Sequence, residues 1–162
     1  MNVAVRFGRI TALALSLCVG ACATSYQPYS FWGGGGFTET EVQPGLFLVR
    51  FIGNEQSTPD RTADFALLRA ADLCLQRGKS HLLLGELATQ YAHTGYLPGS
   101  TASTVVPTGS SDSVAVTVET SPPTPLYSPT SGIAVSCTET TGQGAWDAHY
   151  LERAIRTKYA LT

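Results

Sequence analysis

Hydrophobic and polar positions divide the chain into several strands, two helices and one long stretch that shows neither period. Residues 45–53 (GLFLVRFIG) place aromatic and β-branched side chains on alternating faces, which is typical of a strand. Residues 37–42 are expected to form a shorter strand before it, and residues 81–92 and 132–140 to form two more. These strands predict a single sheet.

Two segments repeat their apolar side chains every three or four residues, as amphipathic helices do. The first begins at Thr58, a suitable N-cap, with Pro59 in the first helical position, and it ends at Gly78, which favours a left-handed cap. Small side chains dominate its apolar stripe, so this helix is expected to lie close to a sheet. Residues 146–162 predict a second helix at the end of the chain.

The order of these elements predicts an α+β fold with a β-α-β start and a C-terminal helix. A strand, a helix and a strand in succession indicate a right-handed crossover between two parallel strands. We therefore expect a small single-domain sheet of three to five strands, with both helices packed on it.

Residues 95–131 interrupt this pattern, since 24 of these 37 residues are Ser, Thr, Pro or Gly. A structureless loop of this length is uncommon inside a compact domain. We interpret the stretch as a Ser/Thr/Pro-rich insertion, in which residues 113–120 alternate well enough to form part of a hairpin. Residues 121–131 contain four prolines and are expected to be extended and mobile.

The first 21 residues contain the three parts of a secretory signal. Arg6 and Arg9 give a cationic start, residues 10–19 are apolar, and Ala21 is the small residue before a cleavage site. The apolar run is about half of the roughly 20 residues that a membrane-spanning helix needs. The expected domain plan is a signal peptide at 1–21, a flexible tether at 22–36 and one α+β domain at 37–162.

Cys22 directly follows the predicted cleavage site, and residues 19–22 (VGAC) resemble the lipobox of bacterial lipoproteins. In that motif the cysteine is acylated and becomes the first residue, and two or more acyl chains anchor a protein stably to a membrane. Ala23 follows instead of an aspartate, which in the enterobacterial sorting pattern favours the outer membrane. The alternatives are an ordinary cleaved signal with an incidental Cys22, or modification of Cys18, which the bulky Leu17 before it disfavours.

Four aromatic side chains lie on the predicted tether, just before a run of four glycines at 33–36. They are Tyr26, Tyr29, Phe31 and Trp32. Two interpretations stay open: the rings rest at the membrane interface, where amphipathic aromatic side chains are favoured, or they pack against the domain.

Charge and spacing exclude several classes of function. Loss of Arg6 and Arg9 with the predicted signal leaves 8 Lys and Arg against 12 Asp and Glu, a formal charge of −4. This balance, with no basic patch, argues against nucleic acid as a partner. No cofactor or metal is expected, because His81, His93 and His149 lack the close spacing that places two ligands on one element.

Candidate chemistry is sparse elsewhere in the chain. Glu39 and Glu41 are spaced to pair as an acid and a base, but alternate residues of a strand more often face solvent together. A Ser/His/acid triad is defined in space and is not readable from the sequence. Cys74 and Cys137 are either a disulfide, which an oxidising periplasm permits, or two buried thiols.

One polar group is a candidate recognition surface for an envelope protein. It consists of Thr38, Glu39 and Thr40 with Gly53 and Asn54. The competing structural interpretation, which we favour, is that Gly53 and Asn54 meet a backbone demand for positive φ.

Three motifs between residues 36 and 73 resemble motifs of a family of short, uncharacterised proteobacterial lipoproteins. They are a Gly-aromatic-Ser/Thr-Glu-Thr start at 36–40, a strand ending in Phe-x-Gly-Asn at 51–54, and a helix reading Ala-Leu-Leu-Arg-Ala-Ala-x-Leu at 66–73. The resemblance implies a membrane-anchored lipoprotein and supplies no activity. Cys74 departs from the pattern, where a small polar residue is expected.

The sequence therefore predicts a lipid-anchored protein of the bacterial envelope, facing the periplasm, with a structural or partner-binding role and no enzymatic activity. The alternative is a tethered periplasmic enzyme, hydrolase-like, whose site the sequence does not reveal. A deep pocket lined by a histidine and an acidic residue would favour the enzyme. An apolar patch or an open sheet edge would favour the binding protein.

Overall fold

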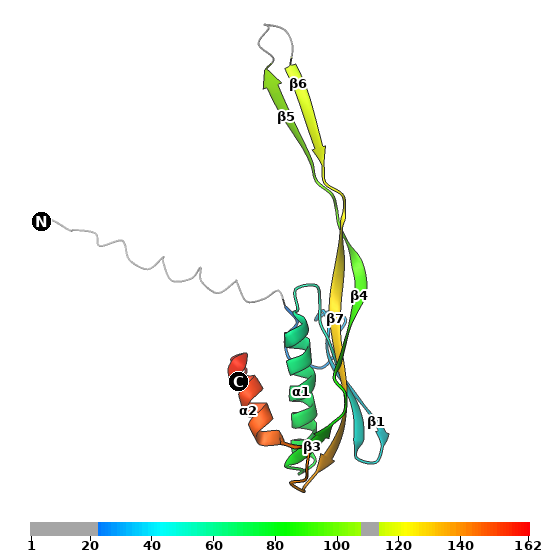
Figure 1. The fold of residues 1–162 in the computed structure, drawn as a ribbon, viewed down its shortest axis with the longest axis vertical. Coiled ribbons are helices and arrows are strands. Elements are labelled where there is room, and N and C mark those ends of the chain that lie inside the picture. The colour runs from blue at the N-terminus through cyan, green and yellow to red at the C-terminus, as the bar shows by residue number, and fades with distance from the viewer. Residues whose placement is uncertain (1–22, 108–113) are drawn as a thin grey trace, which may run out of the picture.

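The computed structural model describes residues 23–107 and 114–162, so Ala21 and Cys22 lie outside the described residues. Two helices cover one face of an antiparallel sheet, and a long two-stranded arm extends away from this body (Figure 1). In chain order the elements are β1 (Gly36–Gln43), β2 (Leu46–Ile52), α1 (Pro59–Gln76), β3 (His81–Leu84), β4 (Ala88–Leu97), β5 (Thr101–Pro107), β6 (Val114–Thr120), β7 (Thr124–Thr138), β8 (Ala145–Asp147) and α2 (Ala148–Lys158).

The predicted sheet of three to five strands is wrong, because the described residues form eight strands in two sheets. Six of them make the main sheet, in the order β1-β2-β7-β3-β8 with β4 also paired to β7, and β5 and β6 form a separate two-stranded sheet. The mixture of helices and antiparallel strands is still roughly α+β. One extra strand, β5, lies in the Ser/Thr/Pro-rich stretch, whose weak alternation conceals its pairing. The others arise because the predicted strand at 81–92 is divided into β3 and β4, and because β8 forms where the second helix was expected to begin.

The two strands on either side of the first helix, β2 and β3, run parallel to each other as predicted, but they are not neighbours in the sheet. β2 and β3 both pair antiparallel with β7, which lies between them. They therefore run in the same direction without touching. The strand that separates them lies about fifty residues further along the chain, so local order alone does not place it.

Helix α1 begins and ends where its capping residues predict. The Thr58 hydroxyl accepts a hydrogen bond from the backbone N–H of Arg61 (3.2 Å), and Gly78 adopts a φ of +72° just beyond the helix. Its buried surface is wider than one alanine stripe and includes Phe65 and Leu68. The reason is that α2 packs along a second side of α1 while the sheet covers the first.

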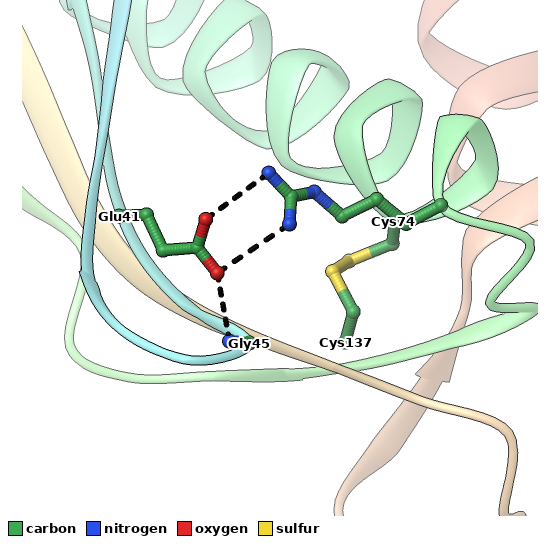
Figure 2. Close-up of a disulfide and its surroundings, with 5 residues drawn as sticks. Glu41, Gly45, Cys74 and Cys137 are labelled. Atoms are coloured by element: carbon green, nitrogen blue, oxygen red, sulfur yellow. Dashed lines mark hydrogen bonds and ion pairs between the residues drawn. A yellow bond between two sulfur atoms is a disulfide. The ribbon is translucent and has the colours of Figure 1, made fainter.

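A disulfide between Cys74 and Cys137 ties the last turn of α1 to β7, so of the two states left open by the sequence the structure has the bonded one (Figure 2). The two Cα atoms are 5.2 Å apart. Close by, the Arg77 guanidinium lies over the ring of Phe47 and pairs with Glu41, which also accepts from the backbone N–H of Gly45. This corner of the domain is held by a covalent bond and an ion pair together.

The second part of the predicted strand at 81–92 and the described parts of the predicted insertion at 95–131 form a two-stranded arm. The strand is broken after β3, where the N–H of Gly85 donates to the carbonyl of Ala134 (2.8 Å), and it resumes as β4. β4 pairs with the first part of β7 over Thr124–Gly132, and the hairpin of β5 and β6 continues the arm beyond them (Figure 1). Residues 121–131, expected to be mobile, lie largely within this ladder.

Candidate functional site

Residues 23–36 are folded against the domain, so the predicted flexible tether is wrong for them. Thr24 is only 2% exposed. Its N–H donates to Ser57 Oγ (3.2 Å), its hydroxyl donates to the Gly34 carbonyl (2.9 Å), and its own carbonyl accepts from Arg61 Nε (3.2 Å). These three bonds, which we call the Thr24 clamp, attach the start of the described chain to α1 and to the turn before it.

Of the four aromatic side chains on the predicted tether, Tyr26 packs against the domain. Its ring lies 5.0 Å from that of Phe37 and 5.5 Å from that of Phe65, measured between centroids. Its hydroxyl donates to Asp72 Oδ2 (2.5 Å). Burial first, and then the Asp72 carboxylate, raise the pKa of Tyr26 above its usual range, so this donor stays protonated.

The other three aromatic side chains of this segment point outward. Tyr29 is 49% exposed, Phe31 79% and Trp32 94%. The rings of Phe31 and Trp32 meet edge to face with centroids 5.7 Å apart. We call Phe31 and Trp32 the aromatic tip.

The candidate recognition residues on β1 do not share one surface. Glu39 lies opposite Val49, on the helix side of the sheet, and its carboxylate receives two hydrogen bonds from Arg69 (2.6 and 3.2 Å). Thr38 and Thr40 alternate with it and lie on the other face. Glu39 therefore connects β1 to α1 and is not available as a free acid.

Gly53 and Asn54 have a structural role, but the reason predicted for it was wrong, because neither has positive φ. A Cβ on Gly53 would lie 2.7 Å from Ser57 Cβ and 2.8 Å from Thr62 Cγ2, so the site admits only glycine without displacement. Asn54 Oδ1 accepts from the Ser57 hydroxyl (2.9 Å) and from the N–H of Gln56 (3.2 Å). The Phe-x-Gly-Asn motif thus builds the turn that leads into α1.

Exposed rings gather on the arm, where the sequence predicted no site. His93 lies between two tyrosine rings, with its centroid 4.6 Å from Tyr96 and 5.5 Å from Tyr127. His93 and Tyr127 are directly opposed in the β4–β7 ladder, as are Tyr91 and Pro129, so these side chains share one face. Tyr91, Tyr96 and Tyr127 are each at least half exposed. We call Tyr91, His93, Tyr96 and Tyr127 the arm cluster.

The sequence does contain a signal for the arm cluster. Tyr91 and His93 are two residues apart, as side chains on one face of a strand are, and Tyr127 supplies another aromatic side chain in the stretch that forms β7. The prolines and threonines around Tyr127 obscure this signal.

Clefts in the described part of the chain include three whose linings contain no histidine. One of them, about 650 Å³, is an open hollow on the sheet face away from the helices, lined by residues such as Leu48, Arg50 and Glu86. An apolar recess of about 310 Å³ lies beside Leu67 and Trp146. Neither combines a histidine with an acidic residue, which is the arrangement expected of the enzyme alternative.

One Ser/His/Asp group does occur, where β3 pairs with β8. The Ser80 hydroxyl lies 2.9 Å from His81 Nδ1, and His81 pairs with Asp147 in the ladder. Asp147 is the N-cap of α2, and the hydrogen bond from the N–H of Tyr150 lowers its pKa. Ser80, His81 and Asp147 do not line the clefts described above.

Among the described residues, no three His, Cys, Asp or Glu side chains gather as a metal site. The helices within the same residues are also too short or too polar to span a bilayer. Comparisons with protein-family models, curated proteins and solved structures found no match to this chain.

Proposed function

We propose that the protein is a lipid-anchored component of the bacterial cell envelope that binds another envelope protein through its arm. In this proposal the signal peptide is cleaved between Ala21 and Cys22, Cys22 is acylated, and the domain faces the periplasm from the outer membrane. The lipobox and the resemblance to proteobacterial lipoproteins support the anchor. The arm cluster is the single observation that carries the binding role.

The arm has the chemistry of a neutral binding surface. Between Leu87 and Ala134 the chain carries only two charged residues, Asp112 and Glu119, while the arm cluster exposes four rings on one face. Tyrosine combines a large apolar ring with a hydroxyl that can donate or accept, and it is enriched at protein interfaces. A partner would therefore be held by ring packing and hydrogen bonds rather than by charge.

The two edges of the arm differ in a way that favours β4 as the edge where a partner strand adds. On β7, Pro125 and Pro129 remove N–H groups, which is how exposed edges are commonly protected. β4 contains no proline and pairs, among the described strands, with β7 alone. An extended segment of a partner could extend the sheet there by main-chain hydrogen bonds.

The register identifies which backbone groups of β4 face this open edge. Pro129 has no N–H, and its carbonyl accepts from the N–H of Gly53 (2.9 Å) on the side away from β4. The Tyr91–Pro129 pair is therefore one of the pairs that exchange no hydrogen bonds. The N–H and carbonyl of Tyr91 consequently point outward, toward a partner.

Site-specific photocrosslinking in the native envelope tests the binding role. A crosslinking side chain at Tyr96 should give an adduct of one discrete mass, whereas the same side chain at the exposed Tyr150 on α2 should give none. In the Tyr96 background, Tyr91→Ala should weaken the adduct, and Tyr91→Pro should abolish it because the outward N–H is also lost. Equal adducts from Tyr96 and Tyr150, or a full-strength adduct in the proline variant, would contradict the proposal.

Acylation is tested separately at the thiol. The mature wild-type protein should begin at Cys22 and carry the mass of its acyl chains. Cys22→Ser should remain unprocessed or lose the lipid. A serine variant that matures normally and still partitions with membranes would show that the anchor is wrongly assigned.

A further inference from the structure

The Thr24 clamp restricts how far the domain can lie from its anchor. Only Ala23 separates Cys22 from Thr24. Because each residue extends the chain by at most about 3.6 Å, the Cα atoms of Cys22 and Thr24 are no more than about 7 Å apart. If Cys22 carries the acyl chains, Thr24 lies close to the membrane surface.

The glycine run next to Thr24 builds a tight turn rather than a linker. Gly34, Gly35 and Gly36 all have positive φ, and Gly35 and Gly36 are buried. A Cβ on Gly35 would lie 2.2 Å from the carbonyl oxygen of Ile52, and a Cβ on Gly36 would lie 2.5 Å from that of Gln27. Side chains are therefore excluded here by close backbone packing as well as by conformation.

This turn holds the aromatic tip outside the domain and near the clamp. Gly34, whose carbonyl accepts from Thr24, donates its own N–H to the carbonyl of Phe31 (3.4 Å). Phe31 and Trp32 are both more than three-quarters exposed and contact each other. No charged residue occurs from Ala23 to Thr38. Two large neighbouring rings in an uncharged segment are expected to have a partner surface.

We propose that Phe31 and Trp32 rest in the headgroup region of the membrane that holds the acyl chains of Cys22. This proposal rests on the acylation proposed above. Aromatic side chains, tryptophan above all, favour the boundary between headgroups and hydrocarbon. The acyl chains and the aromatic tip then provide two contacts near Thr24, so the domain is held in one orientation on the membrane and does not swing on a linker.

Tryptophan fluorescence tests this placement, because the protein has only two tryptophans. Trp146 is 55% exposed on β8, at the opposite edge of the main sheet from β1. The Trp146→Phe variant reports Trp32 alone, and the Trp32→Phe variant is the matched control that reports Trp146. Both are purified in the acylated form and reconstituted into vesicles of phosphatidylethanolamine and phosphatidylglycerol.

The expected result is a shift of Trp32 emission to shorter wavelength on reconstitution, with quenching when the lipids carry brominated acyl chains. Emission from Trp146 should show neither change. One outcome would contradict the membrane contact of the aromatic tip but not the anchor. In that outcome the protein floats with the vesicles, yet Trp32 emission is the same as in the soluble Cys22→Ser form. Protein that lacks acyl mass and does not float would instead overturn the proposed anchor.

Discussion

Opening the Cys74–Cys137 disulfide should destabilise the domain strongly, because the bond closes a long loop. The two cysteines are 63 residues apart, and the loop contains the whole arm. For a loop of this length the chain-entropy relation gives a loss of unfolded-state entropy of about 14 cal/mol/K. At 298 K this entropy corresponds to about 4 kcal/mol in the free energy of unfolding. Since domains of this size are stable by only about 5–15 kcal/mol, the reduced protein should be marginal.

Urea unfolding of the oxidised and the reduced protein measures this loss directly. Reduction should lower the midpoint and raise the slope of the transition, since the opened chain exposes more surface when it unfolds. The double variant Cys74→Ala, Cys137→Ala is the control: it should unfold near the reduced protein, and reductant should not change its midpoint. A wild-type midpoint that is the same with and without reductant would refute the reasoning.

Two further variants test the segment before β1. Tyr26→Phe removes the hydrogen bond to the Asp72 carboxylate and should lower the free energy of unfolding by about 1.5 kcal/mol in urea titrations; an unchanged value would mean that the segment is detached in solution. Gly35→Ala should cost at least about 1 kcal/mol by the same measurement, from its positive φ alone. Gly45→Ala, also at positive φ but with open space around the added Cβ, is its matched control and should cost less.

Features set by neighbouring residues were predictable from the sequence. Thr58, Pro59 and Gly78 delimit α1 because capping depends on groups within a few residues. The alternation in 45–53 marks β2 for the same reason. Long-range pairing was not predictable: β7 pairs with β2, β3 and β4, and its central place depends on strands far away in the chain.

Composition misled the prediction wherever small and polar residues form close contacts. The glycines at 33–36 were predicted to form a flexible coil, yet Gly35 and Gly36 are buried against backbone atoms. The Ser/Thr/Pro-rich stretch read as a mobile insertion, yet Ser131 is fully buried and its hydroxyl lies 2.8 Å from those of both Thr62 and Thr89. Such residues give no hydrophobic pattern, so their packing becomes visible only in three dimensions.

The turn between β2 and α1 is where the start of the described chain and the arm meet. On one side, Ser57 Oγ accepts the N–H of Thr24. On the other, the N–H of Gly53 donates to the carbonyl of Pro129, and a hydrogen bond from the Thr94 side chain lowers the pKa of Glu55.

This turn therefore fixes the arm relative to Thr24. The Phe-x-Gly-Asn motif that forms the turn is needed for this joint rather than for recognition, because Gly53 is buried and leaves no room for a side chain. If the anchor and the seating of the aromatic tip are both correct, the arm extends from the membrane surface at one defined angle. Under the proposed function, an arm held in this way would search a narrow layer of the periplasm, and this restriction would favour partners at a matching height above the bilayer.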